Sequence, residues 1–211
     1  NYHAQGCSGD SRNPDSKPFY VDDFMLVWRQ MERLHDMGLV RNLGMSNMTI
    51  PKLEAVLPLC RIKPTLIEME LHPAFQQPEL FRYCVERGLQ PVGFCPIGSP
   101  NRPDRDKAEG DVVDTAMPAV EAAAKAHGVH PALICLKWAV QNGQIPIPFS
   151  VHEKNYVSNL QCVTEDPLTD EEMEAIRLAD ENCRLVKGQV FLWPGATDWR
   201  ALWDENGVIT Q

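Results

Sequence analysis

The chain has 211 residues, 44% of them hydrophobic, and a formal net charge of −9 at pH 7. This is enough apolar material for one ordinary globular domain with a full-sized core. The negative charge and the lack of a basic run argue against a nucleic acid or an anionic membrane as partner, because both require clustered lysine and arginine. No apolar segment approaches the roughly 18 residues of a membrane span. The seven cysteines have no paired or metal-like spacing, which is typical of buried thiols in a reducing compartment, so we expect a cytoplasmic protein.

Alternating patterns along the chain predict helices and strands in turn. A helix is predicted where apolar residues recur every three or four positions and a cap residue or a glycine marks an end, as at the Thr169 to Glu172 capping box. The expected helices cover residues 22–37, 49–60, 78–88, 114–127, 131–142 and 169–180. The expected strands cover residues 39–47, 65–71, 89–95 and 145–149. A charged loop over residues 101–111 separates the third strand from the next helix.

Four strands that alternate with helices indicate repeated β/α units and therefore an α/β fold with parallel strands. Four units make half of a (β/α)8 TIM barrel, which usually needs about 250 residues. Residues 1–20 have the Gly, Pro, Ser and Asn content of a loop. We therefore expect residues 1–211 to form a single barrel domain that covers about the second half of the barrel, strands 5 to 8, and lacks the N-terminal strands. Residues 181–211 would be a C-terminal tail.

Three ionisable side chains lie near the carboxyl end of the second predicted strand. The strand alternation places Glu68, Glu70 and His72 on one face. One interpretation is an interior ion-pair layer in which Arg41 or another cation neutralises the carboxylates, and a functional site is an equal alternative. A glycosidase pair is disfavoured because its two carboxylates flank the sugar from opposite sides, about 5 Å or more apart. A metal site has suitable ligand types, but one strand cannot complete the coordination.

Polar and aromatic residues also stand at the ends of the other predicted strands. Ser46 and Asn47 close the first strand, Phe94 closes the third, and Ser99 and Ser150 follow the third and fourth. Free amides and hydroxyls in such turns can bind phosphate, and a flat ring can stack on an aromatic ligand. Each signal is weak alone. Their joint occurrence at successive strand ends predicts a ligand-binding edge.

Four segments resemble, in order and spacing, the second half of the aldo-keto reductases. They read GLVRNLGMSN over residues 38–47, EMELHP over 68–73, FCPIGSP over 94–100 and IPFS over 147–150, with Asn159 downstream. The resemblance covers nearly everything from residue 22 to the end. It implies a (β/α)8 barrel that reduces the carbonyl group of an aldehyde, ketone or sugar, without a metal, with hydride from a nicotinamide cofactor.

Carried over position by position, the resemblance assigns cofactor contacts to eleven residues. They are Ser46, Asn47, Glu68, Phe94, Cys95, Ile97, Ser99, Phe149, Ser150, Asn155 and Asn159. Ser46 and Asn47 would hydrogen-bond the nicotinamide carboxamide, and Phe94 would stack on the nicotinamide ring. The segment 95–99 would wrap the pyrophosphate, and Asn159 would reach the adenine.

Four of these positions depart from the family's usual residues. Phe94 stands where a Tyr commonly stacks on the nicotinamide, and its ring keeps the stacking surface. Glu68 stands where the family has Gln and lacks the amide donor. Phe149 and Asn155 stand where a Lys and an Arg usually hold the 2′-phosphate of NADP, which leaves Ser150 and Lys154 for that role. The resemblance implies NADP as the cofactor, and these two departures leave NAD open.

The catalytic residues of the family are not found in this sequence. Its catalytic Asp, Tyr, Lys and His come from the first four strands, and Tyr2 and His3 do not have that strand context. Two alternatives therefore stay open: a cofactor-binding regulatory subunit without turnover, and a metal-assisted hydrolase or aldolase built on Glu68, Glu70 and His72. The tail aromatics form either a wall of an apolar substrate pocket or a clasp against the outer helices. They are Phe191, Trp193, Trp199 and Trp203.

Overall fold

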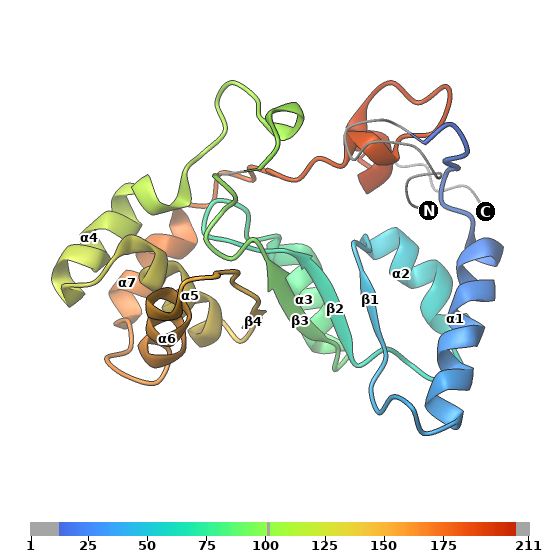
Figure 1. Cartoon of the computed structure of the whole chain (residues 1–211), viewed down its shortest axis with the longest axis horizontal. Coiled ribbons are helices and arrows are strands. Elements are labelled where there is room, and N and C mark those ends of the chain that lie inside the picture. The colour runs from blue at the N-terminus through green and yellow to red at the C-terminus, as the bar shows by residue number, and fades with distance from the viewer. Residues whose placement is uncertain (1–12, 101, 206–211) are drawn as a thin grey trace. The chain divides into compact units, whose positions relative to one another are not determined.

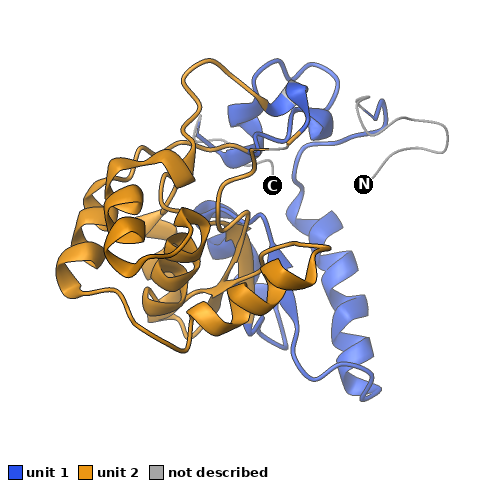
Figure 2. Cartoon of the chain, turned by 60° about the vertical axis from the view of Figure 1, so that its left-hand side comes forward, with its two compact units in different colours: residues 1–65, 103–106, 186–211 blue, residues 66–102, 107–185 orange. Residues whose placement is uncertain are grey.

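The structure, a computed structural model, describes residues 13–100 and 102–205, which fold as two compact units (Figure 2). Unit 1 comprises residues 1–65, 103–106 and 186–211, and unit 2 comprises residues 66–102 and 107–185. Tyr2, His3 and most of the loop expected over residues 1–20 lie outside the described residues. The single barrel domain expected over the whole chain stays a prediction.

Unit 1 is built around helices α1 (Val21–Asp36) and α2 (Ile50–Val56) and the short strand β1 (Gly44–Ser46) (Figure 1). The apolar face of α1 packs against α2 and buries Met25 and Trp28. Thr49 caps α2 through its side chain, as predicted. The remaining elements of unit 1 are short 3-10 helices. They are η1 (Leu57–Leu59), η2 (Asp104–Asp106), η4 (Gln189–Phe191) and η5 (Trp199–Trp203).

Unit 2 contains three parallel strands and the helices that lie between and after them in the chain. Strand β2 (Leu66–Glu70) pairs with β3 (Gln90–Phe94), with Glu70 opposite Phe94, and β3 pairs with β4 (Ile145–Pro146). The carboxyl ends of β2 and β3 therefore lie side by side, as the sequence predicted. The helices follow in chain order. They are α3 (Pro78–Glu86), η3 (Asp114–Ala116), α4 (Pro118–His127), α5 (Pro131–Gln141), α6 (Glu153–Cys162) and α7 (Asp170–Leu178).

The core of unit 2 lies among the helices α4, α5 and α7, which are neighbours in Figure 1. Val120, Ile134 and Ile176 are fully buried there, together with Trp138, which has a relative exposure of 1%. Helix α7 begins with the predicted capping box: the Thr169 side chain accepts from the Glu172 amide, and the Glu172 carboxylate accepts from the Thr169 amide.

Two predicted strands are much shorter than expected. The strand over residues 39–47 is reduced to β1, because Gly38 ends α1 with φ +71° and Leu39 to Asn42 form an irregular connection. The strand over residues 145–149 is reduced to two residues. Pro146 and Pro148 have no amide hydrogen to donate, so this run cannot continue a full ladder.

Burial is confirmed for four of the six cysteines that the structure describes, and Cys95 and Cys183 are half-buried. Cys60, Cys84, Cys135 and Cys162 are buried and free. Burial raises the pKa of the Cys60 and Cys84 thiols to about 11, so both stay protonated at neutral pH. Within the part of the chain that the structure describes, no helix has the length and apolar character needed to cross a membrane.

Candidate active site

A buried ionic cluster lies directly behind the carboxyl ends of β2 and β3. The His72 ring sits between two carboxylates, with Nδ1 2.8 Å from Asp114 Oδ1 and Nε2 3.1 Å from Glu70 Oε1, and all three side chains are fully buried. Both ring nitrogens are therefore occupied. Of the two interpretations of this strand, the interior ion-pair layer is the one that the structure supports for Glu70 and His72.

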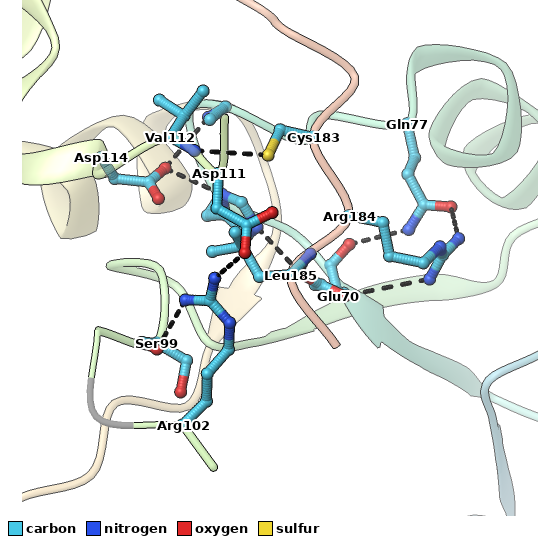
Figure 3. Close-up of polar contacts among 12 residues, drawn as sticks. Glu70, Gln77, Ser99, Arg102, Asp111, Val112, Asp114, Cys183, Arg184 and Leu185 are labelled. Carbon is cyan, nitrogen blue, oxygen red and sulfur yellow. Dashed lines mark hydrogen bonds and ion pairs between the residues drawn. The ribbon is translucent and has the colours of Figure 1, made fainter. Parts of the chain in front are cut away.

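The cluster also ties together distant stretches of backbone (Figure 3). Asp114 Oδ1 accepts the Ala74 amide at 3.0 Å, and Glu70 Oε1 accepts the Leu185 amide at 2.8 Å. Arg184 lies 3.9 Å from the second Glu70 oxygen. The sequence predicted that Arg41 or another cation neutralises these carboxylates. Arg41 is exposed, and the cations beside Glu70 are His72 and Arg184.

The cluster makes stability depend on pH. Burial alone lowers the pKa of His72, but hydrogen bonds to Asp114 and Glu70 and the charges of both carboxylates outweigh it and raise the pKa to about 9. Since the folded pKa exceeds the unfolded value of about 6.5, the stabilisation is fully present below pH 6.5 and is lost as pH rises through 9. We expect the free energy of unfolding to decrease as the pH rises from 6.5 to 9.

Denaturant titrations at pH 6, 7.5 and 9 check this prediction. His127, held between Asp166 and Glu172, also has a raised pKa, so part of the wild-type slope belongs to it. The difference between the wild type and His72→Gln isolates the contribution of His72. If the free energy of unfolding had the same pH dependence in both proteins, the prediction would be contradicted.

The turn after β3 is tight, with two residues in the left-handed region of backbone conformation. Cys95 adopts φ +51° and Gly98 φ +68°, and the Gly98 amide closes the turn on the Cys95 carbonyl at 2.9 Å. Gly98 packs directly on Asp114: a Cβ at residue 98 would lie 2.4 Å from Asp114 Oδ2. The ionic cluster therefore forms the floor of this turn.

The far side of the same turn is held by Arg102. Its guanidinium donates to the Ser99 carbonyl at 3.0 Å and pairs with the Asp111 carboxylate (Figure 3). Phe94, at the end of β3, and Cys95, Ile97 and Ser99, in the turn, are all half-buried. Their side chains are accessible enough to touch a ligand, and Glu68 on β2 is also half-buried.

The segment after β4 is open to solvent. Phe149 is 87% exposed, and the Ser150 hydroxyl accepts the His152 amide at 3.1 Å, just before α6 begins. Asn155 is exposed on the first turn of α6, and Asn159 is half-buried one turn later. These four candidate residues lie on one continuous stretch of chain.

The remaining two candidates, Ser46 and Asn47, belong to unit 1. Asn47 adopts φ +58° and donates to the Ser46 hydroxyl at 2.8 Å. Both line a cavity of about 790 Å³ whose walls also come from α1, α2 and the C-terminal tail. Of the four tail aromatics, Phe191 and Trp193 line this cavity, and the choice between pocket wall and clasp stays a prediction.

Sequence reasoning missed several residues that shape the site. Asp114 was expected only as the start of a helix, and Arg184 and Arg102 were not singled out. No periodic pattern signals such residues, because Asp114 meets His72 across 42 positions of sequence.

Comparison with known proteins identifies the family. The aldo/keto reductase family model matches residues 14–181. The chain is 33% identical over 189 residues to an aldo/keto reductase of Synechocystis, covering 89% of this chain and 58% of that protein. It is 35% identical over 176 residues to aldo-keto reductase family 1 member A1 of Xenopus tropicalis, covering 83% of this chain and 53% of that protein. The chain belongs to the aldo/keto reductase family.

The fold agrees with this membership. A crystal structure of MGS-M4, an aldo-keto reductase from a deep-sea metagenome library of the Medee basin, matches with a TM-score of 0.70 and 23% identity over 79% of this chain and 58% of that one. The chain spans about half the length of the curated relatives it matches. The family match begins at residue 14, inside the expected loop, so it does not support a chain limited to the second half of the barrel.

Proposed function

We propose that the protein is an NAD(P)H-dependent reductase of a small-molecule aldehyde, ketone or sugar, and that this chain supplies most of its cofactor-binding residues. The observation that carries the proposal is the turn after β3. There a half-buried aromatic ring, Phe94, leads into a left-handed turn over Cys95 and Gly98 that rests on a buried ionic cluster. A ring next to a tight backbone turn is suited to hold a nicotinamide and its pyrophosphate.

The residues of this chain fit such a dinucleotide. The cofactor supplies a hydride when it is bound. Phe94 offers a ring face on which the nicotinamide can stack. The turn 95–99 brings backbone amides close to the position proposed for the pyrophosphate. Asn159 is the proposed contact to the adenine. In unit 1, the Ser46 hydroxyl and the Asn47 amide carry the donor and acceptor that a carboxamide requires. Glu68 can accept but, when ionised, cannot donate.

The groups for a 2′-phosphate are weaker than in the usual pattern of the family. Phe149 brings an exposed ring instead of a cation, and Asn155 is neutral. Ser150 and Lys154 are the local groups that remain. NADP is the proposed cofactor on the family pattern, and NAD is the alternative that these two substitutions favour.

Binding and turnover are tested together in the full-length protein. NADPH and NADH are titrated by quenching of tryptophan fluorescence, and their oxidation is followed with aromatic, aliphatic and sugar aldehydes. Saturable binding with aldehyde-dependent oxidation is expected. Binding without turnover would instead support a regulatory subunit, and failure to bind either cofactor would contradict the proposal.

A metal-assisted hydrolase or aldolase has no support in the described ranges. No group of three or more His, Cys, Asp or Glu side chains placed to hold a metal ion is found there. His72, the expected ligand, instead has both nitrogens bound to carboxylates.

Replacing Phe94 with Ala is expected to weaken cofactor binding by about 1–3 kcal/mol, because a half-buried stacking ring is lost. Cofactor titrations of the two proteins measure the effect. Phe81→Ala, which removes a half-buried ring on α3, is the control for loss of an aromatic side chain elsewhere. An unchanged dissociation constant for Phe94→Ala would remove this ring from the cofactor site.

Restoring both family cations, with Phe149→Lys and Asn155→Arg together, is expected to tighten NADPH by a few kcal/mol at most and to leave NADH nearly unchanged. Two charge-assisted contacts to the 2′-phosphate would be gained, and NADH lacks that phosphate. Dissociation constants of both cofactors for wild type and variant decide the matter. Strong wild-type selectivity for NADPH that the substitutions do not improve would contradict relaxed specificity.

A further inference from the structure

A buried ion pair in unit 1 fastens the C-terminal tail to helix α2. Lys52 Nζ lies 3.1 Å from Asp204 Oδ2, and the two side chains are only 7% and 5% exposed. Lys52 also donates to the Leu202 carbonyl, and the Thr49 hydroxyl donates to the Asp204 carboxylate. The ammonium lies 5.5 Å from the centre of the Phe19 ring. Three separate stretches of chain therefore meet at one cation.

The short segment that carries Lys52 also carries two proposed cofactor contacts. Asn47 and Ser46 lie five and six residues before Lys52, at the turn from β1 into α2. Lys52 and Asp204 themselves line the cavity of about 790 Å³ that Ser46 and Asn47 line, and the tail contributes Leu202 to its wall. The pair thus sets where the tail stands relative to these two residues.

Most of the remaining cavity wall is apolar. Phe19, Phe24 and Val27 come from the stretch around α1, and Trp193 comes from the tail. A wall of this kind favours a ligand with an aromatic or bulky apolar group over a small polar one. Displacement of the tail would remove Leu202 and Trp193 from this contact and would leave the β1–α2 turn in place.

The burial of both charges makes the pair sensitive to the loss of either partner. Removing one member of a buried ion pair leaves the other charge desolvated and without that partner, which is more damaging than the loss of an exposed pair. A local change is enough to expose the remaining charge to water, because the tail can detach while α1 and α2 stay folded.

We propose that Lys52 and Asp204 form a tail lock, a pair of positioning residues that holds residues 199–204 as one wall of the substrate cavity and so selects aldehydes and ketones with an aromatic or bulky apolar group. This inference rests on the proposed reductase function for its substrate. The lock itself is independent of turnover.

The test uses the full-length protein and three variants. Lys52→Met and Asp204→Asn each remove one charge, and Lys52→Arg keeps the charge. Arg177→Met is the matched control, since it removes a cation from an exposed pair with Glu174 on α7. Limited trypsin digestion with mass spectrometry gives the rate of cleavage after Arg200, which is exposed in the tail. Benzaldehyde and glyceraldehyde serve as the bulky apolar and the small polar substrate.

Lys52→Met and Asp204→Asn are expected to cleave after Arg200 about tenfold faster than wild type, because proteolysis follows local opening. The KM for benzaldehyde should rise about tenfold with kcat nearly unchanged, as for a lost uniform binding contact. The KM for glyceraldehyde and the cofactor dissociation constant should stay within about twofold. Lys52→Arg should restore most of the wild-type behaviour, and Arg177→Met should match wild type throughout.

If both charge-removing variants are cleaved after Arg200 as slowly as wild type, the proposed tail lock is contradicted. Faster cleavage with an equal rise in KM for both aldehydes would overturn the role in specificity. If Lys52→Met is insoluble, the near-isosteric Asp204→Asn carries the same expectations. If the full-length protein turns over neither aldehyde, the proposed function fails at that point, and the cleavage rates still decide whether the lock exists.

Discussion

Replacing His72 with Gln is expected to lower the free energy of unfolding by about 3–5 kcal/mol at pH 7, the range for one partner lost from a buried ionic group. The variant leaves the Glu70 and Asp114 carboxylates buried without the cation between them. A glutamine amide can donate to only part of this network and carries no charge. Urea unfolding followed by circular dichroism gives the two free energies.

The matched control is His152→Gln. His152 is exposed at the start of α6, and its side chain makes no capping hydrogen bond, so the change should stay within about 0.5 kcal/mol. A loss below about 1 kcal/mol for His72→Gln would mean that His72 is neutral in the folded protein and that the carboxylates do not depend on its charge.

Replacing Gly98 with Ala is expected to lower the free energy of unfolding by about 2–4 kcal/mol and to weaken cofactor binding. The new Cβ would lie 2.4 Å from Asp114 Oδ2, and φ is +68°, so overpacking adds to the strain of a left-handed alanine. The turn can relieve the clash only by moving away from the ionic cluster, which would displace the proposed pyrophosphate site. Chemical unfolding and NADPH titration measure the two effects.

Gly88 provides a closely matched control for the backbone contribution. It has the same φ of +68°, but a Cβ there would meet no atom within 4 Å. Gly88→Ala should therefore lower stability by only about 1–2 kcal/mol and leave cofactor binding unchanged. Equal losses in the two variants would show that the contact with Asp114 contributes nothing.

The local elements of this protein were predictable from its sequence because short-range interactions determine them. Apolar residues three apart in residues 22–37 led to α1 (Val21–Asp36), and the cap at Thr169 led to α7, with boundaries correct to within one or two residues. Four ordered segments led to the family. The strand ends were less predictable, because the pairing of residues 145–149 depends on a neighbouring strand and on two prolines.

Only the tertiary structure decided which side chains meet. The alternation of Glu68, Glu70 and His72 indicated a shared face and left an ion-pair layer and a functional site equally open. The partners that choose between them, Asp114 and Arg184, lie far away in sequence, and Thr49 meets Asp204 across 155 positions. Periodicity reports which side of an element is buried, whereas the charge state and contacts of a buried group depend on neighbours brought together through space. The sequence by itself therefore determined the fold class and the family, and the folded chain determined the ionic floor of the turn and the attachment of the tail.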